Sequence, residues 1–505
     1  MERNATLERE IKLRAPEGLA LPDLRALVGG TVRLPEEHSV TRYFDTSDRR
    51  LWRQGMTFRH RVLVGSGADG EGDWTLKLPG PGSGSALERT EVTWPGPSHE
   101  LPGEAQELLR GLVRRAPLEQ LTLLETTRRR LVLRHEEGHD LAELDDDLVA
   151  VVSGPRAGLR FRQVELEFRD EKWKGRRVVR RLEEAGARVE DTTKLAKAVA
   201  LPPRADGPTL DEKATMADVV LGSLRAGLLR LLDHDWQLRL AQPEPTEHDV
   251  HQARVATRRL RSDLKTFGDI LDPLWRDHMR SELKWLGSIL GELRDKDVLS
   301  EGLPDAPAPV LQRLAVQRVE AGRRLAEAMA SDRYVNLLDR LHAASTRLPL
   351  AAGCTDQAQR SAADSVPGLV AARWHAVRRQ VRRAGPHPSP SQLHRIRIKA
   401  KQLRYAAEAV RPVIGPPAHR TAAAAEEVQT ILGDHHDAVA AETWLRNEFV
   451  DDLAERTSTV SPSVAFEVGR MVAAEQCHAA ASAEQWVDAW PSLRKPTRHR
   501  WLSRN

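Results

Sequence analysis

The sequence predicts an α+β protein in which a strand-rich N-terminal domain precedes an all-α domain. Up to about residue 200, apolar residues mostly alternate with period two, and glycine-rich breaks at 65–73 and 79–85 separate the runs as hairpin loops do. After about residue 210 the chain becomes rich in Ala, Leu and Arg with helical periodicity. A proline-rich stretch at 201–208 separates the segment with period-two alternation from the segment with helical periodicity. The expected domains are residues 1–203 and 214–505, with a linker at 204–213.

Length and composition restrict the class of protein. A chain of 505 residues is too long to form one ordinary hydrophobic core, so more than one domain is expected. Its composition, with 40% hydrophobic and 30% charged residues, is typical of a globular protein in water. No run of about 20 apolar residues occurs, and the charged N-terminus lacks the apolar segment of a signal peptide. We therefore expect a cytoplasmic protein without a membrane partner. The two cysteines, Cys354 and Cys477, exclude a disulfide scaffold and a cysteine-rich zinc site.

The net charge argues against a nucleic-acid partner. The chain carries +4 overall, and residues 1–200 contain 34 bases and 34 acids. Neither part is basic enough in bulk to bind a polyanion through its total charge. Any anion binding must come from the arrangement of the charges.

Charged side chains in the first half recur at every second position, so that acids and bases share one face of each predicted strand. The segment LEREIKL at 7–13 places Glu8, Glu10 and Lys12 together in this way. The same alternation places, strand by strand, Arg59 with Arg61, Lys77 by itself, Arg89 with Glu91, Arg128 with Arg130, Glu143 with Asp145 and Asp147, and Glu165 with Glu167.

An antiparallel sheet with one solvated face explains any single strand of this kind. Two features of the whole set favour a barrel with a charged bore. Amphipathic helices are predicted at 21–28, 104–114 and 174–187, where they can cover the apolar strand faces, and the charged faces interleave acids with bases instead of Ser, Thr and Gln. Such a bore suits a polyanion with divalent cations, because Lys and Arg bind phosphate oxygens and carboxylates hold Mg²⁺ or Mn²⁺.

In their order along the chain, these segments resemble the motifs of the CYTH, or triphosphate tunnel metalloenzyme, superfamily. Glu8-x-Glu10-x-Lys12 is similar to the family's ExExK signature, and the segment YFDT at 43–46 is similar to its Y-x-D-T segment. The segment TTKLAK at 192–197 resembles its late Ser-Lys segment, with Thr193 in place of Ser. The resemblance implies an eight-stranded antiparallel β-barrel tunnel that cleaves triphosphates or, less often, makes cyclic AMP.

The resemblance also implies roles for the charged residues. The bases expected to hold the triphosphate and act in catalysis are Lys12, Arg59, Arg61, Lys77, Arg89, Arg130 and Lys194. The acids expected to hold one or two Mg²⁺ or Mn²⁺ ions are Glu8, Glu10, Asp145, Glu165 and Glu167. A metal in such a site neutralises phosphate charge and activates the attacking water, so that no side-chain nucleophile is needed. Arg128 and Glu143 match the family pattern less closely and rank second.

The second half contains two matching basic helices. Aligning His251 with His394 gives the same spacing of 3, 4 and 3 residues in both copies, which places the basic groups of each copy on one helix face. The first face carries His251, Arg254, Arg258 and Arg261, and the second carries His394, Arg397, Lys401 and Arg404. A solvated face usually alternates charge signs, but the second face has no acid before Glu408. The two faces are therefore predicted to bind an anion.

A second pair of segments indicates that the helical half is duplicated. Gly291 of LGELRDKD lies 40 residues after His251, and Gly433 of LGDHHD lies 39 residues after His394. Two related helical units would bring the basic faces together across a groove. The histidine–aspartate pair that ends at Asp437 also resembles the metal-binding pair of HD phosphohydrolases. The first copy has no histidine at that place, which favours a structural or phosphate-facing role.

The repeated pattern His-x-x-Arg-x-x-x-[Arg/Lys]-x-Leu-Arg resembles the CHAD domain over roughly residues 215–500. Tyr405 after the second copy and the two Leu-Gly-x-x-x-Asp segments extend the resemblance. CHAD domains are α-helical modules that often follow CYTH domains and bind inorganic polyphosphate along a basic groove. The resemblance therefore implies polyphosphate contacts by the eight residues of the two basic faces.

Together, the two resemblances imply a cytoplasmic, metal-dependent hydrolase of inorganic triphosphate or a related triphosphate. Its helical domain is expected to bind inorganic polyphosphate and to feed or localise the enzyme, with polyphosphate granules as a candidate location. Two alternatives stay open. The first is a polyphosphate-binding adaptor with a vestigial tunnel. The second is an adenylate cyclase or a thiamine triphosphatase that uses the same tunnel.

Overall fold

A computed structural model describes residues 5–65, 71–80, 87–202, 210–211, 213–450, 461–495 and 500–503. The chain forms two compact units, Met1–Ala205 and Asp206–Asn505, and each is described by itself. Most of the predicted linker at 204–213 lies outside the described residues. Within the described ranges, no helix is long and apolar enough to cross a membrane.

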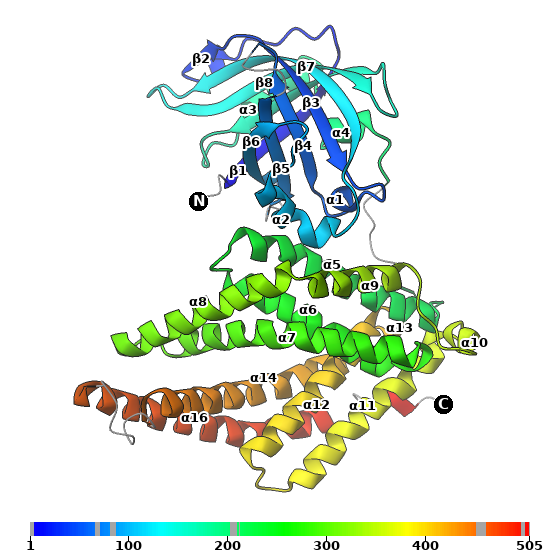
Figure 1. Ribbon diagram of the computed structural model, residues 1–505, viewed down its shortest axis with the longest axis vertical. Coiled ribbons are helices and arrows are strands. Elements are labelled where there is room, and N and C mark those ends of the chain that lie inside the picture. The colour runs from blue at the N-terminus through cyan, green and yellow to red at the C-terminus, as the bar shows by residue number, and fades with distance from the viewer. Residues whose placement is uncertain are drawn as a thin grey trace. The chain divides into compact units, whose positions relative to one another are not determined.

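The N-terminal unit is a closed antiparallel barrel (Figure 1). Its strands are β1 (Ala5–Ala15), β2 (Gly30–Arg33), β3 (Glu37–Asp45), β4 (Thr57–Leu63), β5 (Glu71–Pro79), β6 (Leu87–Pro97), β7 (Glu119–Arg134), β8 (Asp140–Ser153), β9 (Arg160–Phe168) and β10 (Arg188–Val189). The order is β10-β1-β6-β5-β4-β3-β7-β8-β9, and β1 also pairs with β9. Since β2 and β10 pair only at the margins, eight strands form the closed wall, which confirms the predicted barrel.

Apolar side chains on the outer face of the wall pack against helices. The helices of this unit are η1 (Arg25–Leu27), α1 (Arg50–Arg53), α2 (Gly103–Val113), α3 (Arg176–Glu184) and α4 (Lys194–Ala198). Leu13, Leu144 and Leu166 belong to one buried cluster with Val178 and Leu182 of α3. The alternation therefore turns apolar residues outward to the helices and charged residues inward.

One of the three helices predicted in the first half is wrong. The segment 21–28 forms only the short 3₁₀ helix η1. Pro22 and Gly29 bracket six residues, which is too short to offset the cost of helix nucleation. The other two expected helices are present as α2 and α3.

An apolar plug fills the barrel interior next to α4. Thr126 of β7 opposes Val149 of β8, and Leu124 opposes Val151 two residues further along the two strands. These valines and Leu124 belong to a buried cluster with Leu195, Ala198 and Val199. The charged part of the bore therefore has an apolar floor.

The C-terminal unit is all helical in the residues that the structure describes (Figure 1). Its main helices are α5 (Met216–Leu240), α6 (Glu247–Phe267), α7 (Pro273–Gly302), α8 (Ala308–Ala330), α9 (Asp332–Thr346), α11 (Ala362–Ala384), α12 (Pro390–Ala409), α14 (Pro416–Leu445) and α16 (Pro462–Arg494). Shorter pieces are η2 (Gly268–Ile270), α10 (Thr355–Ala358), α13 (Arg411–Ile414), η3 (Arg446–Val450) and η5 (Arg500–Ser503). The predicted all-α domain is confirmed.

Side-chain caps explain where several of these helices begin. Thr215 and Asp218 form a reciprocal capping box at the start of α5, and the Thr246 hydroxyl accepts a hydrogen bond from a backbone N–H in the first turn of α6. Asp272 caps α7, with Pro273 in the first helical position. These caps fix the start of α6, and hence the place of the basic face that it carries.

Replacing Gly227 in α5 by Ala is expected to destabilise the helical unit. A Cβ at this position would lie 2.4 Å from Cδ2 of Leu260, which is fully buried on α6. Overpacking of this kind costs about 1–3 kcal/mol, which exceeds the gain of about 1 kcal/mol from helix propensity. Thermal unfolding followed by helical circular dichroism should show a lower Tm. Gly469→Ala in α16 is the matched control, because a Cβ there meets nothing within 4 Å; its Tm should be unchanged or higher. A Gly227→Ala protein as stable as the wild type would contradict the packing.

Candidate active site and basic groove

The period-two alternation places the predicted charged residues on the inner wall of the barrel. Directly opposite residues of an antiparallel pair project from the same face. The registers pair Lys12 with Glu165, Glu10 with Glu167, and Asp145 with Glu165. The predicted residues that share this wall are Glu8, Glu10, Lys12, Arg59, Arg61, Lys77, Arg89, Arg130, Asp145, Glu165 and Glu167.

Lys194 enters the bore from a helix. It is the first residue of α4, and the Thr193 hydroxyl caps that helix. Its Nζ lies 2.6 Å from Asp147 Oδ2 and 2.6 Å from Glu165 Oε2. Burial acts to raise the pKa of Glu165, but Lys194 and the other bases around it hold that pKa well below its usual value. Lys194 therefore stabilises two buried carboxylates as anions.

Other lysines on the wall also pair with acids. Lys12 Nζ lies 2.6 Å from Glu10 Oε1, and both side chains are nearly inaccessible to solvent. Lys77 Nζ lies 2.6 Å from Glu8 Oε2. Arg89 opposes Glu8 in the β1–β6 register and is buried, and it forms no ion pair with another residue of the described ranges. Most of the lysine charge is thus balanced by acids of the bore itself.

Arg128, ranked second from the sequence, forms three ion pairs. Its guanidinium binds Asp147 at 2.7 Å, contacts Asp145, and lies 3.5 Å from Glu165. Arg130 binds Asp145 at 2.7 Å. The sequence analysis places Asp147 on the inner face but gives it no role. Its position two residues after Asp145 could have indicated that it belongs to the site. In the structure Asp147 is fully buried and pairs with Arg128 and Lys194.

Strand β3 contributes an acid that the sequence analysis misses. Glu37 Oε2 lies 3.5 Å from Arg61 Nη2, and Glu37 Oε1 lies 4.0 Å from Arg130 Nη1. The next inner positions of β3 are Ser39 and Thr41, which are buried and uncharged. A single acid followed by hydroxyl residues shows no charge alternation, so the sequence holds no signal that Glu37 lies on the inner wall.

Arg59 and Arg61 present unsatisfied cationic groups. Their Nε atoms are buried and form no hydrogen bond with any residue that the structure describes. Arg59 Nη2 lies 3.4 Å from Glu91, which is long for a charge-assisted hydrogen bond. Burial lowers the pKa of Arg61 to about 10, and repulsion from Arg128 and Arg59 adds to this effect. An anion bound at this wall would satisfy both guanidinium groups.

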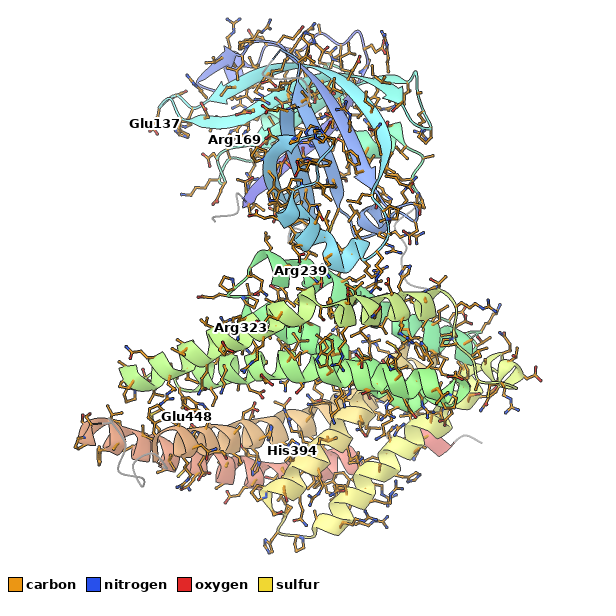
Figure 2. All side chains as sticks on the ribbon, viewed as in Figure 1. Glu137, Arg169, Arg239, Arg323, His394 and Glu448 are labelled. Carbon is orange, nitrogen blue, oxygen red and sulfur yellow. The ribbon has the colours of Figure 1, made fainter. Side chains whose placement is uncertain are left out.

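Carboxylates crowd another part of the wall. Burial, with the nearby charges of Glu8 and Asp145, raises the pKa of Glu167 to about 7, although Arg169 at 2.8 Å acts in the opposite direction. Glu143 Oε1 lies 3.1 Å from Nη2 of Arg169, which is labelled in Figure 2, so one guanidinium contacts two acids. Hard divalent cations take oxygen ligands and relieve such crowding. These oxygen donors suit Mg²⁺ or Mn²⁺ by their chemistry. Among the described residues, however, no three of the bore acids have ligand atoms within 4.8 Å of one another, so they would have to leave their basic partners to share one cation.

In the helical unit, the basic faces of α6 and α12 lie near each other. Burial lowers the pKa of Lys401 to about 6, and Arg258, Arg397 and Arg254 add repulsion. The Nε atoms of Arg258 and Arg397 are buried without a hydrogen bond to any described residue. We call Arg254, Arg258, Arg397 and Lys401 the central cluster. His251 precedes it on α6 and is exposed.

The repeated glycines of α7 and α14 seat the arginines of the central cluster. A Cβ on Gly291 would lie 3.4 Å from Arg254 Nη2, and a Cβ on Gly433 would lie 3.7 Å from Arg397 Nε. Each guanidinium therefore lies against the neighbouring helix at a residue without a side chain. Asp295, one turn after Gly291, lies 3.4 Å from Arg254. This contact explains the spacing of the Leu-Gly-x-x-x-Asp segments.

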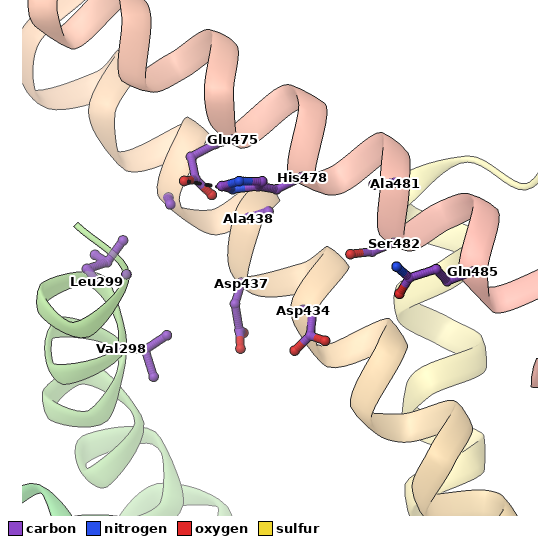
Figure 3. A pocket seen from close by; sticks show the side chains of 12 residues that line it. Val298, Leu299, Asp434, Asp437, Ala438, Glu475, His478, Ala481, Ser482 and Gln485 are labelled. Carbon is purple, nitrogen blue, oxygen red and sulfur yellow. Dashed lines mark ion pairs between the residues drawn. The ribbon is translucent and has the colours of Figure 1, made fainter. Parts of the chain in front are cut away.

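The histidine–aspartate pair of α14 faces two different partners. His436 Nδ1 shares a hydrogen bond of 3.2 Å with Nδ1 of His394, which belongs to α12 and is labelled in Figure 2. Burial, followed by repulsion from Arg397 and His394, lowers the pKa of His436 to about 4. Asp437 and Asp434 instead line a pocket between α7, α14 and α16 (Figure 3). The pair does not converge on one metal as the HD interpretation requires.

The far ends of the two basic faces differ. Arg404 of α12 lies 2.7 Å from Glu408 and 2.9 Å from Glu426, so acids neutralise it. Arg261 of α6 forms no ion pair within the described ranges, and its pKa is lowered by burial and by repulsion from Arg280. The positive charge therefore continues along the first face beyond the point where the second face is neutralised.

Comparison with known proteins agrees with this architecture. Residues 6–198 match the CYTH domain family, and residues 222–446 match the CHAD domain family. The chain belongs to the CYTH–CHAD family. It is 30% identical over 487 residues to Uncharacterized protein Rv2226 of Mycobacterium tuberculosis, in an alignment that covers 87% of this chain and 88% of that protein.

Two solved structures resemble part of this CYTH–CHAD chain. PptA from Streptomyces chartreusis is 23% identical, with 55% of this chain and 100% of that chain covered and a TM-score of 0.43. The CHAD domain of the plant Ricinus communis is 24% identical, with 56% of this chain and 96% of that chain covered and a TM-score of 0.42.

Replacing Lys194 by Ala is expected to destabilise the CYTH unit. Removal of one partner from a buried ion pair costs about 3 kcal/mol or more, and both Asp147 and Glu165 lose a contact of 2.6 Å. Because Lys194 holds the pKa of Glu165 low, its stabilising effect is present above the usual pKa of a glutamate and disappears as the pH falls below it. The Tm deficit of the variant should therefore be large near pH 7 and shrink as the pH is lowered.

Thermal unfolding of the full chain measures this deficit. Lys174→Ala, at an exposed position, is the matched control and should leave the Tm unchanged. A deficit that is absent at neutral pH, or that grows toward acid pH, would contradict the role of Lys194.

Proposed function

We propose that the CYTH unit hydrolyses inorganic triphosphate, or a related triphosphate, with Mg²⁺ or Mn²⁺, and that the CHAD unit binds inorganic polyphosphate. One observation carries the catalytic part. A single closed wall holds Arg59 and Arg61, whose buried Nε donors lack a partner among the described residues and whose acid contacts are long, together with the carboxylates around Glu167. A phosphate anion and a divalent cation supply what each set lacks.

Substrate binding in this proposal is an exchange of partners. Before binding, Lys12 pairs with Glu10 and Lys77 pairs with Glu8. With a triphosphate and a cation in the bore, the lysines turn to phosphate oxygens and the glutamates turn to the cation. The cation would offset part of the negative charge that the triphosphate brings, and the exchange would leave both the lysines and the glutamates with partners of opposite charge.

In this proposal, residues on the inner wall hold the triphosphate in place and polarise it. Arg59 and Arg61 donate hydrogen bonds to its oxygens, and Lys194 holds the end of the bore nearest the apolar plug. Glu8, Glu10, Asp145, Glu165 and Glu167 are the proposed metal ligands. A bound Mg²⁺ or Mn²⁺ neutralises phosphate charge and lowers the pKa of the attacking water. The apolar floor excludes bulk water from that end, which strengthens each electrostatic contact.

A substrate panel separates this function from its rivals. Purified full-length protein is incubated with tripolyphosphate, ATP and thiamine triphosphate, with and without Mn²⁺. Metal-dependent phosphate release, fastest from tripolyphosphate, supports the proposal. Formation of cyclic AMP from ATP would instead identify an adenylate cyclase. Preference for thiamine triphosphate would identify a thiamine triphosphatase. Polyphosphate binding without turnover of any substrate would identify an adaptor at polyphosphate granules.

Arg130→Ala is expected to lower kcat/KM for the preferred triphosphate by about 10- to 100-fold, the cost of one hydrogen bond to a charged group. Arg130 lies on the inner wall, whereas its neighbour Arg129 lies on the outer face and pairs with Glu36. Arg129→Ala removes the same charge from the same strand, and it should keep kcat/KM within about twofold. Equal losses in the two variants would show that the inner wall has no special role.

Polyphosphate affinity is expected to fall as the pH rises from about 6 to about 8. The pKa of Lys401 is about 6 without a ligand, because burial and three arginines disfavour its charge. A bound polyanion raises this pKa, so binding takes up a proton above pH 6 and weakens by at most about tenfold per pH unit. Calorimetric titration at constant ionic strength measures the trend, and Lys401→Arg, which stays charged, should flatten it. A wild-type affinity that is constant over this range would contradict the assignment.

A further inference from the structure

A second group of basic side chains gathers at the C-terminal end of α6, outside the central cluster. Its members come from two pairs of consecutive helices that are distant from each other in sequence: Arg261 and Lys265 of α6, Arg280 of α7, Arg373 of α11 and Lys399 of α12. We call these five residues the terminal cluster. The sequence analysis identifies only Arg261 of this group as a binding residue.

The members of the terminal cluster are close enough to repel one another. The pKa of Lys265 is lowered by burial and then by Lys399, Arg373 and Arg280. Arg373 Nη2 donates a hydrogen bond of 2.6 Å to the backbone oxygen of Lys265, which fixes its guanidinium beside the end of α6. Burial and Arg280 likewise lower the pKa of Arg261. The packing of the helices therefore holds these cations together.

Few acids compensate this charge. Arg280 lies 3.4 Å from Asp277, which also binds Arg276 at 3.0 Å. In the described ranges, neither Lys265 nor Lys399 forms an ion pair. Ordinary solvated helix faces mix charge signs at neighbouring positions. These five half-buried cations have only Asp277 beside Arg280 and Asp269 near Arg373 as compensating acids, and an anion bound among them would relieve their mutual repulsion.

The terminal cluster continues the basic face of α6. Lys265 follows Arg258 by seven residues, which places the two side chains on the same helix face about 10 Å apart along the axis. The corresponding end of the basic face of α12 carries no uncompensated charge, because Glu408 and Glu426 neutralise Arg404. Among the described residues, a linear anion that leaves the central cluster therefore meets uncompensated positive charge toward the C-terminal end of α6 and not toward Arg404.

We propose that the terminal cluster is a second phosphate-binding site, or second station, so that the CHAD unit binds long polyphosphate at two places and short chains at one. This inference rests on the proposed polyphosphate binding. The central cluster determines whether a chain binds. The terminal cluster determines how strongly affinity rises with chain length, because only a chain that spans both stations contacts all nine cations.

The double variant Lys265→Gln/Lys399→Gln tests the proposal in the full-length protein. Binding of long-chain polyphosphate is measured by calorimetric titration with EDTA present, so that the metal-dependent bore is idle. Loss of two charge contacts should weaken long-chain binding about tenfold or more. The slope of log affinity against log salt should fall by about 1.4, by analogy with single-stranded nucleic acids. Tripolyphosphate affinity should stay within about twofold of the wild-type value.

Arg382→Gln/Arg383→Gln is the matched control, because it removes two exposed positive charges from α11. It should leave the long-chain affinity and the salt slope unchanged. Equal weakening by the control and the test variant, or equal weakening of short and long chains by the test variant, would overturn the second station while leaving polyphosphate binding intact. Absence of polyphosphate binding by the wild-type protein would instead overturn the proposed function of the CHAD unit.

Discussion

The pairing of β1 with both β6 and β9 is the constraint on which the CYTH unit depends. An open sheet with the same alternation would expose one face of charges to water, where each pair is worth little. Closure turns that face into an enclosed wall, with Glu10 and Lys12 almost inaccessible. The first strand therefore supplies charged groups and, by pairing on both sides, also encloses them. The outward residues of the same strand, such as Leu13, pack beneath helices and stabilise the closed form.

Enclosing so many ionised groups is costly unless nearly every one has a partner. Lys194, Arg128 and Lys77 meet this condition through short contacts with acids. The buried Nε donors of Arg59 and Arg61 are then informative, because they lack a partner among the described residues on a wall where the neighbouring charges are paired, which makes them candidates for contact with a ligand. The inner wall thus combines pairs that maintain the fold with groups that remain available for a ligand.

Period-two and helical spacing were enough to predict the barrel, the helical unit and the faces of most charged residues, because each depends on local geometry. Contacts between distant segments were not predictable in the same way. Glu37 faces Arg61 only because β3 lies beside β4, and its own strand shows no charge alternation. Arg404 matches Arg261 in the repeat, yet Glu426 of α14 neutralises it. A repeat predicts equivalent backbone positions, whereas the charge at each position depends on the neighbours that packing supplies.

The two units handle anions by opposite electrostatic arrangements. In the bore, acids and bases are interleaved at contact distance, so a phosphate must arrive with a cation or displace internal partners. In the helical unit, Arg254 and Arg397 lie against glycines of α7 and α14, and cations outnumber acids around Lys401. A balanced site favours exchange of ligands and turnover, since the ligand-free state is already neutralised. An unbalanced site favours retention, since the ligand relieves repulsion that the fold maintains. The hydrolysis proposed for the first unit and the polyphosphate retention proposed for the second therefore depend on the same physical quantity, the charge that each unit leaves uncompensated.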